Sequence, residues 1–238
     1  MGLLRGVHYF GSFLLLVGCV LFVISSISAP VVGRISMLTV YLTGNGDRSP
    51  TVAFGTFGWC VNNASGASNG CSRSMVGYNI FNILSGLLPA NEDRLDSWAA
   101  ATANGLTNVM VLHPVAAGLA FISFVLSLTS GLFGGIIAML AALFTFIVAL
   151  VVVVCDFVLF SYVRSKIQEA NRDSWASYGS GAWCALAGLV VIFIAFVITF
   201  VTCCAGRREK KRQTNVVKES HHGDYGTPTR RRRFWQRR

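Results

Sequence analysis

Charged residues are scarce in this sequence of 238 residues. Only 13% of its residues are Asp, Glu, Lys or Arg, whereas 53% are hydrophobic, and soluble domains average about 25% charged residues. The mean hydropathy is +0.58. This composition excludes an ordinary soluble domain and predicts an integral membrane protein.

Sequence patterns typical of enzymes are also missing. There is no HExxH, GxSxG or P-loop motif, and Cys60 and Cys71 have no neighbouring His or Cys that could complete a metal site. Two of the four histidines, His221 and His222, lie near the C-terminus. A channel or transporter is disfavoured because the apolar segments show no inverted repeat. We therefore predict a non-enzymatic protein without catalytic residues, cofactor or metal.

Positive charge is concentrated at the C-terminal end. Residues 207–238 contain 12 Lys and Arg and 3 Asp and Glu, so they carry +9 of the formal net charge of +10. A basic segment that directly follows an apolar one typically binds anionic lipid headgroups. We therefore predict anionic membrane lipids, and no nucleic acid, as partners of this tail.

Four apolar segments are long enough to cross a bilayer core of about 30 Å as helices. The first could instead be a cleaved signal peptide, but its apolar stretch is longer than the roughly 7–15 residues usual for one. The predicted fold class is an all-α membrane protein, a four-transmembrane-helix bundle with a small disulfide-linked, β-rich extracellular domain. Its predicted parts are the N-terminus and first span (1–29), an extracellular loop domain (30–107), the second span (108–130), a short cytosolic turn and the third span (131–162), a second extracellular loop (163–180), the fourth span (181–204) and a disordered basic cytosolic tail (205–238).

The orientation of these segments follows from the distribution of Lys and Arg. A basic cluster at residues 207–212 comes directly after the last apolar segment, and such clusters stay on the cytosolic side of the membrane. Four spans then place the N-terminus in the cytosol as well. Both polar loops are therefore predicted to lie outside.

The first polar loop contains the stretch Val52–Asn79, in which two β-prone runs flank a tip rich in Gly, Ser and Asn. This pattern predicts a hairpin. Cys60 and Cys71 lie on either side of the tip, and a disulfide between them would stabilise the loop by about 3 kcal/mol; a pair of free cysteines is the alternative. The tip also carries the single N-x-S/T motif of the sequence, at Asn63, which predicts glycosylation on the extracellular side.

Two ionisable residues lie inside apolar segments. His113 precedes a proline in the second segment, and Asp156 follows four valines and a cysteine in the third. Because a charge inside a span costs roughly 2.5–3.5 kcal/mol, both residues are candidates for a functional site. The short connection between the two segments makes their helices antiparallel neighbours, so we predict that the two side chains interact directly or through one water. The alternative is that Asp156 only bonds a neighbouring hydroxyl, backbone N–H or Arg near the outer boundary.

Cys203 and Cys204 lie where the last apolar segment meets the basic cluster. This is the usual position for S-palmitoylation, and an acyl chain beside a polybasic patch gives two additive membrane signals. The two residues are therefore candidate palmitoylation sites. Two unmodified cysteines at a helix end are the alternative.

Several of these features together resemble a known family. The motif FGTFGWC, the following Cys71-Ser72 and the dipeptide Gly77-Tyr78 resemble the first-loop signature of the fungal PalI/SUR family of four-span membrane proteins, as do LHPVAAGLAF and Asp156 in the later segments. The resemblance is closer to the PalI branch, and the loop is distantly similar to that of claudins. The signature residues are Phe54, Gly55, Phe57, Gly58, Trp59, Gly77 and Tyr78.

The resemblance implies a function that composition cannot give. PalI-type proteins are plasma-membrane accessory proteins of ambient-pH signalling that help a PalH-type seven-span pH sensor to reach or stay in the membrane. Relatives on the other branch instead organise cortical membrane domains. The resemblance therefore predicts a pH-signalling accessory protein or, alternatively, an eisosome-like or claudin-like structural organiser, and a homo-oligomer is a further candidate assembly.

Overall fold

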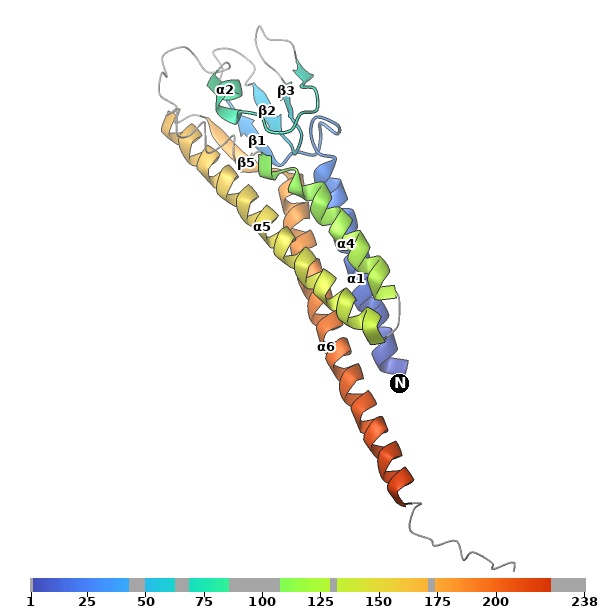
Figure 1. Cartoon of the computed structure of the whole chain (residues 1–238). Helices are drawn as coiled ribbons and strands as arrows, with labels where there is room; N and C mark the ends of the chain where they lie inside the picture. Colours follow the sequence, from blue (N-terminus) through green and yellow to red (C-terminus); the bar gives the residue numbers. More distant parts are fainter. Residues whose placement is uncertain are drawn as a thin grey trace, which may run out of the picture.

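A computed structural model describes residues 2–42, 50–62, 69–85, 108–128, 132–170 and 174–223. These residues include four long helices, which pack lengthwise and carry a small sheet at one end (Figure 1). Helix α1 contacts α4 and α6, and α5 contacts the same two helices, so the four enclose a common core. The helices are α1 (Gly2–Ser26), α4 (Leu112–Leu128), α5 (Leu132–Ala170) and α6 (Ser180–Gly223).

Three of these helices are long and apolar enough to cross a membrane, over Gly6–Ser26, Gly135–Gln168 and Ser180–Gly206. The protein is therefore a mostly helical, multi-pass membrane protein. Helix α4 is also apolar but has 17 residues, which corresponds to about 26 Å at helical rise. Because a perpendicular span needs about 20 residues, the expected count of four spans stays a prediction.

The sheet lies over the end of the bundle at which α1 ends and α6 begins (Figure 1). Its described strands are antiparallel and have the order β4-β3-β2-β1-β5. They are β1 (Leu38–Tyr41), β2 (Thr51–Phe54), β3 (Trp59–Asn62), β4 (Gly70–Cys71) and β5 (Trp175–Tyr178), and a short helix, α2 (Ile80–Ser85), follows β4.

One face of the sheet packs on the bundle. Because side chains of a strand alternate between faces, Leu38 and Val40 of β1 point the same way, and both are buried. They join Val52 and Phe54 of β2 in a core that continues into the upper part of α5. This core fixes the sheet on the helices. The α5 residues in it are Leu159, Phe160, Val163 and Ile167.

The middle of the bundle is filled mainly by small residues. Ala116, Ala117 and Ala120 of α4 are buried against Ala149 of α5 and Ala185 of α6. Small side chains let helix backbones approach closely, which is the common mode of helix packing in membranes. The described helices therefore interlock without a wide polar interior.

The segment predicted as the second loop, residues 163–180, contains the end of α5 and strand β5. Helix α5 continues to Ala170 because Val163 and Ile167 keep an apolar stripe facing the core beneath the sheet. Strand β5 then pairs with β1, from Leu38 opposite Tyr178 to Tyr41 opposite Trp175. The sequence could not indicate this pairing because the two strands are far apart in the chain.

In the tail that was predicted to be disordered from residue 205 onward, the structure describes a helix as far as Gly223. Helix α6 runs without interruption to Gly223. Its basic continuation is rich in Arg, Lys, Glu and Gln, which are good helix formers. A helix that is already nucleated also extends without a new nucleation cost. Residues 224–238 lie outside the described residues.

Candidate functional site

The side chains of His113 and Asp156 meet beneath the sheet. His113 Nε2 lies 3.0 Å from Asp156 Oδ2, and the two side chains are 0% and 4% exposed. Asp156 is about 32 Å along α5 from Gly135 at helical rise, which is about the thickness of a bilayer core. The pair therefore lies at the end of the spans that the sheet covers.

The other imidazole nitrogen of His113 is bound to the backbone. His113 Nδ1 lies 3.0 Å from the carbonyl oxygen of Met110, and a carbonyl can only accept, so Nδ1–H is the donor. Nε2 and Asp156 Oδ2 are therefore left to each other: they lie 3.0 Å apart, and neither atom has a hydrogen-bond partner among the described residues. Two bare lone pairs would repel at this distance, so the contact is favourable only when one of the two groups carries a proton.

Tyr78 forms part of the cover over this pair. Its ring lies 6.2 Å from that of Phe54 and 5.5 Å from that of Trp59. Its hydroxyl donates a hydrogen bond to the carbonyl oxygen of Gly55. The structure thus gathers four of the predicted signature residues into one cluster.

Burial raises the pKa of Tyr78, and the nearby charge of Asp156 raises the same pKa further. Tyr78 therefore stays a neutral hydrogen-bond donor at alkaline pH. Tyr78 also lies in one buried core with Leu159 and Phe160, which are within about one turn of Asp156 on α5.

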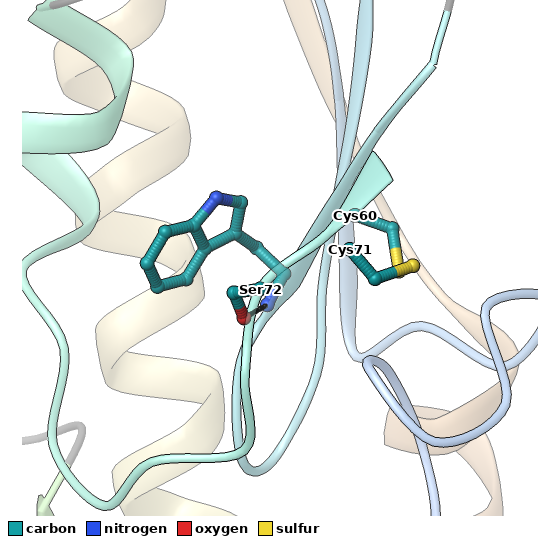
Figure 2. The surroundings of a disulfide bond; sticks show 4 residues. Cys60, Cys71 and Ser72 are labelled. Carbon is teal, nitrogen blue, oxygen red and sulfur yellow. Dashed lines mark hydrogen bonds between the residues drawn. A yellow bond between two sulfur atoms is a disulfide. The ribbon is translucent and has the colours of Figure 1, made fainter. Parts of the chain in front are cut away.

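A disulfide fixes the strand beside this cluster. Cys60 of β3 and Cys71 of β4 are cross-strand partners and form the predicted bond (Figure 2). The next residue, Ser72, accepts a hydrogen bond at its side chain from the backbone N–H of Trp59 at 3.1 Å. Because side chains alternate along β3, Trp59 points toward the bundle and Cys60 away from it.

Comparison with known proteins gives the family of this chain. The profile of the SUR7/PalI family matches residues 4–195, which is most of the chain and includes the sheet, nearly all of α1, the whole of α4 and α5, and the first part of α6. The chain belongs to the SUR7/PalI family. It is also similar to the pH-response regulator protein palI/prr-5 of Neurospora crassa, with 28% identity over 199 residues. That match covers 82% of this chain but 24% of the relative, so the chain spans about a quarter of the relative's length.

The glycines of the SUR7/PalI signature allow close approaches between segments. A Cβ atom on Gly55 would collide with the carbonyl oxygen of Ala29 and lie 2.6 Å from its nitrogen. Gly77 has a φ of +66°, which favours glycine, and a Cβ there would collide with the side chain of Asn108. The loop therefore packs directly on the residues that follow α1 and on those that precede α4, the helix of His113.

The aromatic residues of the signature are buried to different extents. Phe54 is fully buried, whereas Phe57 and Trp59 are half-buried. Gly58 lies between the latter two in the connection from β2 to β3, where a Cβ would collide with the hydroxyl of Ser72. Phe54 is thus the main hydrophobic anchor of the sheet, and Phe57 lies in the turn rather than in a strand.

The remaining predicted site residues lie elsewhere. Cys203 is half-buried on α6 near Gly135 of α5, and Cys204 is exposed. Asn63 lies outside the described residues. The structure therefore does not bring Cys203 and Cys204 together with the buried pair.

A second polar cluster, at the opposite end of the bundle, was not predicted. His8 Nε2–H donates to the carbonyl oxygen of Ser127 at 2.9 Å, and the hydroxyl of Ser127 donates to that of Ser12 at 2.8 Å. These contacts join α1 to the end of α4. The spacing of four residues between His8 and Ser12 places them on one helix face and was the available signal.

Removing the disulfide should destabilise the sheet. For Cys60→Ser we expect a loss of about 3 kcal/mol in unfolding free energy, because the closed loop no longer restricts the unfolded chain. Thermal unfolding in detergent and export from the endoplasmic reticulum measure the effect. Cys184→Ser, which changes a free cysteine of α6, is the control. The double variant Cys60→Ser/Cys71→Ser should match the single one; free Cys60 in the unreduced wild type would contradict the prediction.

Proposed function

We propose that this chain acts as a non-enzymatic accessory protein of ambient-pH signalling. In this proposal it supports the localisation or stability of a seven-span pH sensor in the plasma membrane. The contact between the two buried ionisable side chains of His113 and Asp156 is the observation that carries the proposal, in which the pair shares one proton. The printed name of the Neurospora crassa relative, a pH-response regulator, supports the same direction.

The buried pair offers a physical link between pH and conformation. If alkaline conditions remove the shared proton, a lone pair of His113 faces the Asp156 carboxylate, and the two helices are pushed apart. Among the described residues, the groups around the pair are Phe22 of α1, whose ring lies 6.1 Å from that of His113, and Tyr78 of the cover. Tyr78 lies between β4 and α2 and is the titratable neighbour outside the helices, whereas Cys155 is next to Asp156 on α5 itself. A change at the pair would therefore reach the outer surface through Tyr78.

A four-span arrangement with cytosolic termini is part of this proposal. The disulfide lies at one end of the helices and the basic residues 207–212 follow the other end. Disulfides persist in oxidising compartments, whereas Lys and Arg clusters stay in the cytosol. Both features support an extracellular sheet. Glycosylation at Asn63 would be on the same side.

The basic C-terminal region would contact the inner surface of the membrane. Residues 207–238 carry most of the net positive charge, and each Lys or Arg near an anionic surface contributes about 1 kcal/mol to binding. An acyl chain on the exposed Cys204 would add to this attraction. Cys203 is the less accessible acceptor because it packs near Gly135.

The role of the pair in pH signalling is tested by growth at alkaline pH. A fungal strain that lacks the protein should grow poorly there, and Asp156→Asn should restore growth less well than wild type because a neutral amide cannot hold the shared proton. Arg164→Gln, at an exposed residue of the same helix, is the control. Equal alkaline growth with Asp156→Asn and wild type, at equal surface levels, would contradict the proposal.

The alternative function is a structural organiser of cortical membrane domains. It is supported by the family itself, whose name joins SUR7 to PalI, and by lipid-facing helix surfaces free to contact other copies. Capture from a mild detergent distinguishes the two. A seven-span receptor in the eluate supports signalling, whereas self-association into static patches without a receptor supports organisation.

A further inference from the structure

The face of the sheet that points away from the bundle carries a row of aromatic and polar residues. Strand register aligns Trp175 with Tyr41, Tyr41 with Thr51, and Thr51 with Asn62. Cross-strand partners lie on the same face, so the four side chains form one continuous row. With neighbouring strands about 4.8 Å apart, the row is about 14 Å long. This is the length of a short oligosaccharide.

This face has no charge in the part of the strands that the structure describes. Its residues have hydroxyl, amide, aromatic or small side chains: Thr39, Tyr41, Thr51, Ala53, Cys60, Asn62, Cys71, Trp175 and Ser177. Ala53 and Cys60 on this face are buried, so the accessible part is the row itself. The solvated face of an antiparallel sheet is polar, and a polar but uncharged row matches an uncharged, hydroxyl-rich ligand.

Trp175 provides a flat platform at one end of the row. Its side chain is 52% exposed although its ring is stacked on that of Tyr41, with centroids 4.1 Å apart and an angle of 11° between planes. The stacking fixes the ring before any ligand binds, which lowers the entropy cost of binding. A rigid aromatic ring of this kind gives a large contact area for the C–H face of a sugar.

The position of the row also argues against a role as a membrane anchor. Trp175 is at the end of β5 away from Tyr178, which packs on α5 with its ring 5.2 Å from that of Phe157. Three residues of a strand correspond to about 10 Å. Along β5, Trp175 therefore lies about 10 Å from the contact that Tyr178 makes with the membrane-spanning part of α5.

We propose that this row binds a neutral glycan outside the cell, with Trp175 and Tyr41 as the stacking platform and Thr51 and Asn62 as hydrogen-bonding groups. Thr51 and Asn62 can each donate and accept hydrogen bonds to sugar hydroxyls. The proposal is independent of the pH sensor and depends only on the sheet being extracellular. It commits to a glycan of another molecule rather than to the chain's own glycan at Asn63.

The test measures binding of neutral oligosaccharides to the full chain. The protein is placed in phosphatidylcholine nanodiscs, because sugar-headed detergents would compete. The probes are trimers to hexamers of glucose, N-acetylglucosamine and mannose, and an oligomer of glucuronic acid is the charged comparison. Tryptophan fluorescence and saturation-transfer NMR report binding. We expect at least one neutral series to bind and the charged oligomer not to bind.

Variants identify the row as the site. Trp175→Ala should weaken binding about tenfold, since an aromatic stack is lost, and Trp175→Phe should retain part of the affinity. Asn62→Ala should weaken binding severalfold. Trp183→Phe, at an exposed tryptophan of α6, should bind as wild type. An intact disulfide in each variant confirms folding.

Four outcomes would overturn the proposal. The first is that no neutral oligosaccharide binds, and the second is that binding is unchanged in both Trp175 variants. The third is that the neutral probes bind to Asn63→Gln but not to wild type. In that case the chain's own glycan would occupy the row in the wild type. Quenching of Trp175 by brominated lipids would also count against the proposal, since it would place the row in the membrane interface.

Discussion

Replacement of Asp156 by leucine is expected to lower the free energy of unfolding by about 3–5 kcal/mol, the loss usual when one partner of a buried pair is removed. The loss arises because His113, which is fully buried, would keep a ring nitrogen without a partner. Reversible unfolding in detergent, or resistance to denaturation at increasing temperature, measures the difference. Arg164→Gln should change stability by less than about 0.5 kcal/mol, as is usual for exposed residues.

The double variant His113→Leu/Asp156→Leu separates stability from function. Apolar side chains of similar volume often replace a buried ion pair without loss, so the double variant should recover most of the stability. It should nevertheless fail to restore alkaline growth, since no proton remains to be released. A double variant that restores alkaline growth would show that the pair serves only the packing of α4 and α5.

Gly55→Ala is expected to give the second large effect. The added methyl group would meet the backbone of Ala29 rather than a side chain, so relief requires the sheet to move away from α1. The cost should be about 3 kcal/mol, at the upper end of overpacking effects. Thermal unfolding and the yield of oxidised protein measure it. The hydrogen bond from Tyr78 to Gly55 should also be lost.

Gly70→Ala is the matched control for this substitution. Gly70 belongs to the same sheet, but a Cβ atom there would have no neighbour within 4 Å. Its substitution should therefore change stability by less than about 0.5 kcal/mol. Similar losses for both variants would show that the close approach at Ala29 does not limit the packing of the loop.

The buried pair shows how much of the candidate site could be predicted from the sequence. Two ionisable residues in strongly apolar segments are unusual, and the short connection between the segments forced their helices together. Helical rise then placed the two side chains at similar depth. The sequence could not give the hydrogen bond from His113 to the carbonyl of Met110, because it depends on how the chain turns before α4.

The sequence by itself determined the membrane character, the end of the chain that carries the charge, the disulfide and the family. Each of these follows from composition, local spacing or a motif. Only the tertiary structure decided that β5 completes the sheet, that Tyr78 covers the His113–Asp156 pair, and that His8 joins α1 to α4. These contacts connect residues far apart in the chain, and their geometry depends on how whole helices pack. Local propensity carries no information about that packing.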